Sequence, residues 1–194
     1  HPSRNILAGH KLEQVRRARR AGFNVPKTLV TQDAAVLRRF WQACSGKVIL
    51  KPLSGGYLER EAPGRDTLIY TNPLREQDLM RTAEIARCPT LFQERIAKQA
   101  DIRITVVDGD LQAVELTATD NDEPRLDIRR NNMTDVVYHR TVLPRPIESS
   151  IRRILRSYGL RFAAIDMVRD FRGKYFFLEI NPNGQWAWLD MAGA

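Results

Sequence analysis

Apolar residues recur at two different spacings along the chain, one typical of helices and one typical of strands. Near the start, Leu7, Leu12, Val15 and Ala18 approximate one helical stripe, and Gly22 is a suitable C-terminal stop. The mixture of helices with largely antiparallel strands predicts an α+β fold. The segments predicted as helices are 5–22, 32–44, 76–86 and 145–158, and those predicted as strands are 26–31, 47–51, 68–71, 91–96, 101–107 and 111–117.

The C-terminal region holds the most informative pattern, two apolar runs around a short polar loop. Both runs are rich in Val, Ile, Phe and Tyr, and the loop at 171–174 contains glycine, so a β-hairpin is predicted. One-for-one pairing from this loop places Asp170 opposite Tyr175 and Asp166 opposite Glu179. Directly opposed side chains lie on the same face with Cβ atoms about 5 Å apart. The sequence therefore predicts two neighbouring carboxylates on one face of the hairpin.

Asn181 shares that face with Glu179, because side chains alternate along a strand. Three oxygen donors would then converge on an otherwise apolar hairpin, and two carboxylates repel each other unless a cation separates them. Mg²⁺ prefers a few protein oxygens together with phosphate and water, so Asp166, Glu179 and Asn181 are predicted metal ligands, with Mn²⁺ as a substitute ion. The alternative is ordinary turn chemistry at 181–184, with Asp166 as a solvated strand residue.

Composition and charge restrict the partners of the chain. Its net charge of +8 over 194 residues indicates acidic partners, and nucleic acid, nucleotide phosphates and acidic peptides all satisfy this. No apolar run approaches the ~20 residues of a membrane span, and the first residues are too polar for a signal peptide. Two cysteines without metal or disulfide spacing favour a reduced, cytoplasmic setting. Because the chain lacks an initiator Met, we expect a fragment of a longer protein.

Further segments carry charged residues at positions suited to anionic ligands. Lys51 ends an apolar strand before a Ser-Gly-Gly-Tyr loop that can approach phosphate; the alternative is a strand-end lysine reaching water. Asp101 and Arg103 share a strand face, which also fits a solvated ion pair. Arg129 belongs to a basic run that can clamp phosphate or carboxylate, or is simply exposed surface. The polar region 118–140 lacks periodicity and is expected to be a long functional loop or partly disordered.

Taken in order, these segments resemble the ATP-grasp ligases over nearly the whole chain. Glu-Ile-Asn at 179–181, after an Asp-bearing strand, is the most specific element of that superfamily. The extension Asn-Pro-Asn-Gly-Gln-Trp-Ala-Trp-Leu at 181–189 is similar to the ribosomal-peptide maturases known as microviridin-type graspetide synthetases, which are related to the ribosomal-protein glutamate ligases.

The resemblance implies a nucleotide held between two small α+β lobes. These would be 1–95, with the first helix, the Lys51 strand and the glycine loop, and 96–194, with the metal site. The N-terminal domain that precedes this region in full-length relatives is expected to be missing. By the resemblance, Lys11 and Lys51 contact ATP phosphates, Gln93, Glu94 and Ile96 line the adenine pocket, Asp101 meets the ribose, Arg103 and Arg129 lie near the γ-phosphate and the acceptor carboxylate, and Asp166, Glu179 and Asn181 hold Mg²⁺.

The resemblance also implies a reaction. With ATP, Glu or Asp side chains of a precursor peptide would become acyl phosphates, and Ser, Thr or Lys side chains of its core would then form ester or amide crosslinks. Alternatives are addition of glutamate or another amino acid to a peptide or protein C-terminus, and a nucleotide-binding pseudoenzyme. A non-catalytic, basic nucleic-acid-binding module is disfavoured, since the carboxylates would repel phosphate. No membrane partner is expected, and a homodimer stays open.

Overall fold

The computed structural model describes residues 2–53, 57–58, 67–120 and 123–185. The chain forms two compact units, a large unit of His1–Val25 with Ala97–Ala194 and a small unit of Pro26–Ile96. The predicted glycine loop at 54–56 and residues 186–189 of the 181–189 extension lie outside the described residues.

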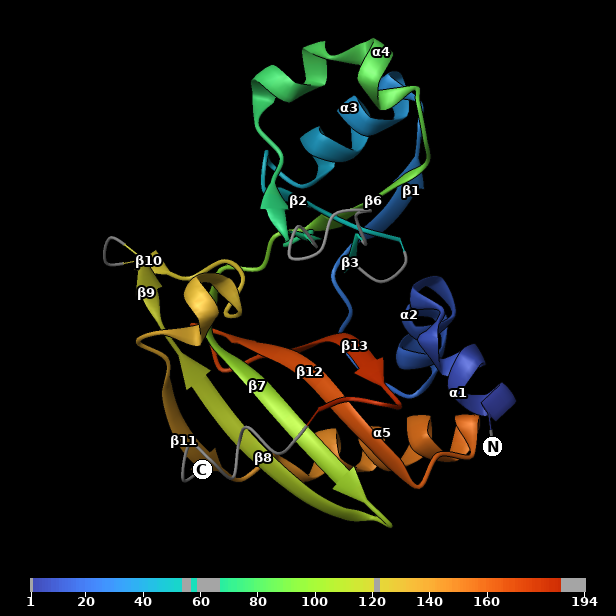
Figure 1. The fold of residues 1–194 in the computed structure, drawn as a ribbon, viewed down its shortest axis with the longest axis vertical. Helices are drawn as coiled ribbons and strands as arrows, with labels where there is room; N and C mark the ends of the chain where they lie inside the picture. Colours follow the sequence, from blue (N-terminus) through green and yellow to red (C-terminus); the bar gives the residue numbers. More distant parts are fainter. Residues whose placement is uncertain (1, 54–56, 59–66, 121–122, 186–194) are drawn as a thin grey trace. The chain divides into compact units, whose positions relative to one another are not determined.

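The large unit is built on a five-stranded antiparallel sheet with the strand order β11-β8-β7-β12-β13 (Figure 1). The helices α1, α2 and α5 contribute buried apolar residues to the core on one face of this sheet. The strands are β7 Lys98–Val107, β8 Asp110–Thr117, β11 Val137–Thr141, β12 Phe162–Asp170 and β13 Tyr175–Asn181, and the helices are α1 Pro2–Gly9, α2 Lys11–Arg20 and α5 Arg145–Tyr158.

Alternation along the strands divides apolar from charged side chains in this unit. Ile102 and Ile104 of β7 and Ile165 of β12 are buried in one cluster with Ile151 and Ile154 of α5. Because successive side chains point to opposite faces of a sheet, the residues between these isoleucines project from the other face. That second face carries the charged residues of the candidate site.

The small unit has a four-stranded antiparallel sheet of order β1-β6-β2-β5 and a core of its own. Leu37, Val48 and Phe92 are buried together there. Asp33 caps α3: its carboxylate accepts from two backbone N–H groups at 2.7 and 3.0 Å, and these bonds hold the pKa of Asp33 below its usual value. The elements are β1 Thr28–Thr31, α3 Ala34–Ala43, β2 Val48–Lys51, the paired β3 Tyr57–Leu58 and β4 Thr67–Leu68, β5 Asn72–Pro73, η1 Glu76–Met80, α4 Thr82–Ile85 and β6 Thr90–Glu94.

The N-terminal segment differs from the prediction in two ways. The predicted helix 5–22 is two helices separated at His10, whose backbone is extended (φ −80°, ψ 106°). The predicted first lobe, 1–95, includes residues 1–25, but these group with the large unit because α1 and α2 pack against β13 and α5. The predicted boundary between the two lobes, after residue 95, lies one residue before the observed division after Ile96.

Three other predictions need adjustment. The predicted helix 76–86 is a 3₁₀ turn and a short helix, separated at Arg81 (φ −82°, ψ 55°). The predicted strand 68–71 is replaced by β4 and β5, and β5 pairs with β2. The region 118–140, predicted as a loop, contains regular structure: β9 Thr119–Asp120, β10 Glu123–Pro124, η2 Arg130–Met133 and most of β11.

Among the described helices, none is long and apolar enough to cross a membrane.

Candidate functional site

The predicted pairing of Asp166 with Glu179 is present across β12 and β13. The one-for-one pairing that predicted it is wrong near the loop, because Tyr175 lies opposite Arg169 rather than Asp170. Asp170 is the last residue of β12, and its carboxylate accepts from the backbone N–H groups of the following turn at 2.8 and 2.9 Å. A β-bulge that leaves Leu178 without a partner in the register then restores the Asp166–Glu179 pair.

Arg103 extends this pair to the neighbouring strand. It lies opposite Asp166 on β7, and its Nη1 donates to both carboxylate oxygens of Asp166, at 2.7 and 2.9 Å. Its Nη2 donates to the carbonyl of Gln185 at 2.7 Å. The Arg103 side chain is 11% exposed and that of Asp166 is 32% exposed, so the guanidinium is shielded from water while the carboxylate is partly accessible. A protein cation therefore already offsets part of the repulsion between the two carboxylates.

The sequence suggested a pair between Asp101 and Arg103, whereas the structure shows Arg103 bound to Asp166 and Asp101 bound to Lys98. Lys98 Nζ donates instead to Asp101 Oδ2 at 2.5 Å and to the carbonyl of Leu126 at 3.1 Å. The side chains of Lys98 and Asp101 are 9% and 16% exposed. This pair attaches β7 to the loop that precedes Arg129.

The segment after β13 folds back over the sheet. Asn181 Oδ1 accepts from the backbone N–H of Asn183 at 3.0 Å, and the Gly184 N–H donates to the Asn181 carbonyl at 3.2 Å. A Cβ built on Gly184 would lie only 2.3 Å from Ala164 Cβ, which shows how closely this turn packs on β12. The turn interpretation of 181–184 is thus confirmed, and metal binding by Asn181 stays a prediction.

Lys11 and Arg129 bring two more cations near the carboxylates. Burial lowers the pKa of Lys11; the Glu179 carboxylate opposes this shift, and Arg129 adds to it. Hydrogen bonds to Asp127 raise the pKa of Arg129, and the charges of Glu179 and Asp166 raise it further. The five predicted residues Lys11, Arg103, Arg129, Asp166 and Glu179 therefore interact as one charged cluster on the large unit.

Arg129 is held by residues that the sequence did not single out. Asp127, which is buried, accepts from Arg129 Nε at 2.9 Å and from Nη2 at 2.7 Å. Arg125 is 3% exposed, and it donates to Asp120 Oδ1 at 3.0 Å and to the Thr134 carbonyl at 3.0 Å. No sequence signal could identify these residues, because charged residues in a polar run are normally solvated.

The predicted site residues of the small unit form their own contacts. Lys51 Nζ donates to Gln93 Oε1 at 2.9 Å, and Gln93 Nε2 donates to Thr28 Oγ1 at 3.2 Å. Gln93 is buried, which fixes this chain of bonds across β2, β6 and β1. The Glu94 carboxylate accepts from the backbone N–H of Lys27 at 3.2 Å. Ile96 is partly buried where the small unit ends. An adenine pocket formed by these residues stays a prediction.

Within the described ranges, no group of three or more His, Cys, Asp and Glu side chains is gathered as a metal centre. The predicted ligand set has two carboxylates and one amide, and it does not depend on such a group. Two carboxylates plus substrate phosphates are a usual ligand set for Mg²⁺. The chemistry of the donors therefore fits this ion.

The chain is similar to one protein family. The sequence profile of that family, described as "Prokaryotic glutathione synthetase, ATP-grasp domain", matches residues 20–181. No curated protein sequence matches the chain.

Solved structures with the same fold include ligases. A RiPP-associated ATP-grasp ligase from Chryseobacterium gregarium, in complex with ADP and a leader and core peptide, is 30% identical with a TM-score of 0.85, covering 98% of this chain and 56% of that chain. The macrocyclase MdnC from Microcystis aeruginosa MRC, bound with precursor peptide MdnA, is 27% identical with a TM-score of 0.80, covering 97% and 56%. The macrocyclase MdnB from the same organism is 27% identical with a TM-score of 0.75, covering 98% and 57%. The chain spans about half the length of these structures, and the predicted ATP-grasp fold is confirmed.

Proposed function

Because this chain belongs to the ATP-grasp domain family of prokaryotic glutathione synthetases, we propose that it forms the ATP-binding and ligating part of a peptide-crosslinking ligase. Its substrate would be a ribosomal precursor peptide whose core contains acidic residues together with Ser, Thr or Lys. The observation that carries this proposal is the charged cluster of Lys11, Arg103, Arg129, Asp166 and Glu179. A peptide substrate is supported by the two relatives that were solved with peptides.

The proposed reaction has two steps. A carboxylate oxygen of the peptide attacks the γ-phosphorus of ATP, the bond to the β-phosphate oxygen breaks, and ADP leaves. The peptide then carries an acyl phosphate. A Ser or Thr hydroxyl, or a Lys amine, attacks the acyl carbon and loses its proton. The bond between the acyl carbon and the phosphate oxygen breaks, and inorganic phosphate leaves with that electron pair. No protein nucleophile is needed, so the protein contributes alignment and electrostatic stabilisation.

Asp166, Glu179 and Asn181 would hold the divalent ion. The pairing of Asp166 with Glu179 puts two carboxylates on one face, and Asn181 lies two residues further along the same strand. When bound, Mg²⁺ neutralises charge on the triphosphate and polarises its γ-phosphate. Arg103 then has two tasks, since it orients the Asp166 carboxylate and adds positive charge beside it.

The remaining cations would bind the anionic groups of the substrates. Lys11 and Arg129 lie close enough to Glu179 to interact with its charge, and we assign them to the phosphates and the acceptor carboxylate. Arg125 donates to the Thr134 carbonyl, and Arg129 donates to the Asp127 carboxylate. These bonds fix the loop that carries Arg129, so the guanidinium charge of Arg129 is positioned before substrate binds.

On the small unit, Lys51 would contact phosphate as a point charge, held in place by its bond to Gln93. Gln93, Glu94 and Ile96 are assigned to the adenine pocket. Glu94 is engaged by Lys27, so backbone groups of β6 are better suited to read the base than its side chain. Asp101, on the large unit, is assigned to the ribose.

A reduced, cytoplasmic setting is part of the proposal. Both cysteines of the chain, Cys44 and Cys88, are described, and both are free thiols. Cytoplasm is also the compartment that supplies ATP.

The test is mass spectrometry of a precursor peptide incubated with this protein, ATP and Mg²⁺. The probe is the peptide encoded by a short gene next to this one, selected for an acidic core with Ser, Thr or Lys. Each crosslink would remove one water from the peptide mass. The second candidate, amino-acid addition, is favoured by the glutathione synthetase description of the family and would increase the mass by one residue. An unchanged mass without ADP formation would refute both.

A further inference from the structure

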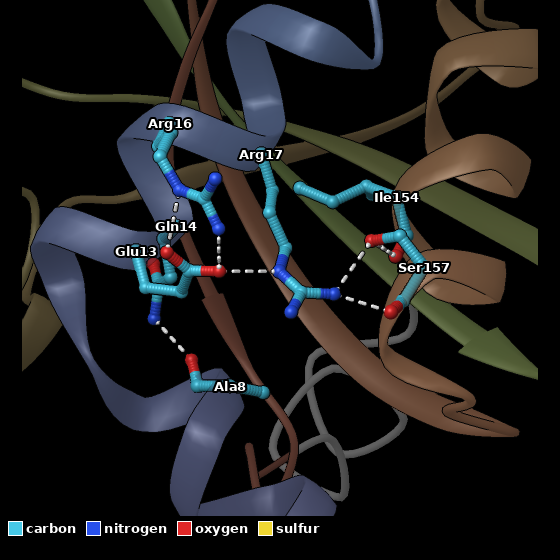
Figure 2. Close-up of polar contacts among 7 residues, drawn as sticks. All are labelled: Ala8, Glu13, Gln14, Arg16, Arg17, Ile154 and Ser157. Carbon is cyan, nitrogen blue, oxygen red and sulfur yellow. Dashed lines mark hydrogen bonds and ion pairs between the residues drawn. The ribbon is translucent and has the colours of Figure 1, made fainter.

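The side chain of Gln14 joins helix α2 to the outer edge of strand β13. Its Nε2 donates to the carbonyl of Ile180 at 2.9 Å, and its Oε1 accepts from the N–H of Ile180 at 3.0 Å. The same Nε2 donates to the Ala8 carbonyl at 2.6 Å, which ties α1 to α2 (Figure 2). Gln14 is 3% exposed. Its amide therefore pairs with an edge strand as another strand would, and it satisfies backbone groups that water would otherwise have to reach.

This contact lies between two residues of the candidate site. Lys11 is three residues before Gln14, so both side chains lie on the same side of α2. Glu179 directly precedes Ile180 on β13. The charge of Glu179 acts on Lys11, so the two groups are close in space. The bonds between Gln14 and Ile180 thus fix the helix that carries the cation against the strand that carries the carboxylate.

A separate set of contacts attaches α2 to α5 (Figure 2). Arg17 donates to the carbonyl of Ser157 and, from its Nε, to the Glu13 carboxylate at 2.7 Å, and its guanidinium carbon lies 4.3 Å from the centre of the Tyr158 ring. These bonds hold the helix on the core but do not involve β13. The chain therefore offers a matched control, in which α2 is loosened without loss of the contact to Ile180.

We propose that Gln14 is a positioning residue that sets the placement of Lys11 relative to Glu179 by binding both backbone groups of Ile180. The inference rests on the proposed function, since that function assigns Lys11 to phosphate and Glu179 to the metal. Gln14 itself is not among the residues that the proposed function assigns to either substrate. Its effect on ligand binding is exerted through Lys11.

The first test measures native-state hydrogen exchange at the Ile180 amide and needs no ligand. Gln14→Met keeps the length of the side chain but removes all three hydrogen bonds. We expect exchange at Ile180 to become roughly tenfold faster or more, as for a locally opened strand edge. Arg17→Met should leave it close to the wild-type rate. Unchanged exchange in Gln14→Met would overturn the proposal.

The second test is a double-mutant cycle read by calorimetric titration with ADP and Mg²⁺. Lys11→Met is expected to weaken ADP binding roughly tenfold in the wild-type background, as for loss of a charged hydrogen bond. In the Gln14→Met background the same change should cost less than about threefold, because Lys11 is no longer held in place. In the Arg17→Met background it should cost as much as in the wild type. An equal loss in all three backgrounds would mean that Gln14 is merely structural.

The outcomes separate this proposal from the proposed function. A wild-type chain that binds no nucleotide would refute the function and with it the role of Gln14 in ligand binding, while the exchange rate of Ile180 still decides whether Gln14 fixes β13. If Gln14→Met fails to fold, Gln14→Glu takes its place. Glutamate keeps the shape and the acceptor atom but cannot, when ionised, donate to the carbonyls of Ala8 and Ile180.

Discussion

Asp166 lies directly opposite Glu179 across β12 and β13, and the bulge at Leu178 keeps the two carboxylates on one face of the sheet. Arg103 binds the Asp166 carboxylate from the next strand. The two acids therefore differ in their surroundings. Asp166 accepts hydrogen bonds from the buried guanidinium of Arg103, whereas Glu179 interacts with the charge of Lys11. The charge of Arg129 acts on both acids. The two acids would hold a divalent ion, and the three cations beside them would offset negative charge of the triphosphate and the acceptor carboxylate.

The first prediction concerns this pair. Asp166→Asn and Glu179→Gln remove one charge each with little change of shape, so the fold should persist while Mg²⁺-dependent ADP formation falls by at least about 100-fold. The measurement is ADP release against Mg²⁺ concentration, with circular dichroism to check the fold. Asp170→Asn is the control, because Asp170 lies on the same strand but serves the turn. Near-normal Mg²⁺-dependent activity in both variants would refute the metal assignment.

The second prediction concerns Lys51. Lys51→Ala removes a positive charge whose position is fixed by the hydrogen bond to Gln93. We therefore expect the affinity for ATP, measured by calorimetry, to fall roughly tenfold or more. Lys47→Ala, an exposed lysine just before the same strand, removes an equal charge and should leave the affinity nearly unchanged. Unaltered ATP binding in Lys51→Ala would remove this lysine from the site.

Local alternation explains which parts of the site could be predicted from the sequence. The hairpin and the facing of Asp166 with Glu179 follow from two apolar runs around a short loop. The predicted pairing of Asp170 with Tyr175 was wrong, because the sequence does not show which residues lack a cross-strand partner at the turn. Two local irregularities, in the turn and at Leu178, cancel before the acids are reached.

Features that depend on distant partners could not be predicted. In the sequence, Gln14 is not distinguished from the other polar residues of its helix. Its hydrogen-bond partner is nevertheless Ile180, near the other end of the chain. Arg125 and Asp127 lie in a polar run, where burial is not expected. The apolar stripe of the first helix also continues through the break at His10, so periodicity alone merges α1 with α2.

The third prediction tests the close packing of Gly184. In Gly184→Ala the new Cβ would meet Ala164 Cβ at 2.3 Å and Arg103 Nη2 at 3.1 Å. Neither the strand nor the buried guanidinium can yield freely, so the free energy of unfolding should fall by about 1–3 kcal/mol in urea titrations. Activity should fall as well, because the turn also supplies the carbonyl of Gln185 to Arg103.

Gly9→Ala is the matched control for this change. A Cβ on Gly9, at the end of α1, would meet no described atom within 4 Å other than its chain neighbours and the backbone of its own helix. Alanine there should leave the stability unchanged or increase it by at most about 1 kcal/mol. If both variants were as stable as the wild type, the turn at 181–184 would not pack on β12 as the structure has it.

The fourth prediction uses the contacts of Glu13 with the arginines of its own helix. Hydrogen bonds from Arg16 and Arg17 lower the pKa of Glu13 from 4.5 to about 2 (Figure 2). Because the folded pKa lies below the unfolded one, the ionised carboxylate stabilises the folded state above about pH 4.5. This contribution is lost as the pH falls through about 2, where the folded state also takes up the proton.

The difference in unfolding free energy between the wild type and Glu13→Gln should therefore be constant from pH 7 to about 5 and should shrink between about pH 4.5 and 2. Urea titrations over this range measure it. Arg16→Gln should reduce the pH dependence of the wild type, because it removes the largest cause of the shift, whereas Arg19→Gln, exposed on the same helix, should not. A difference that stayed constant down to pH 2 would mean that the charge of Glu13 does not stabilise α2.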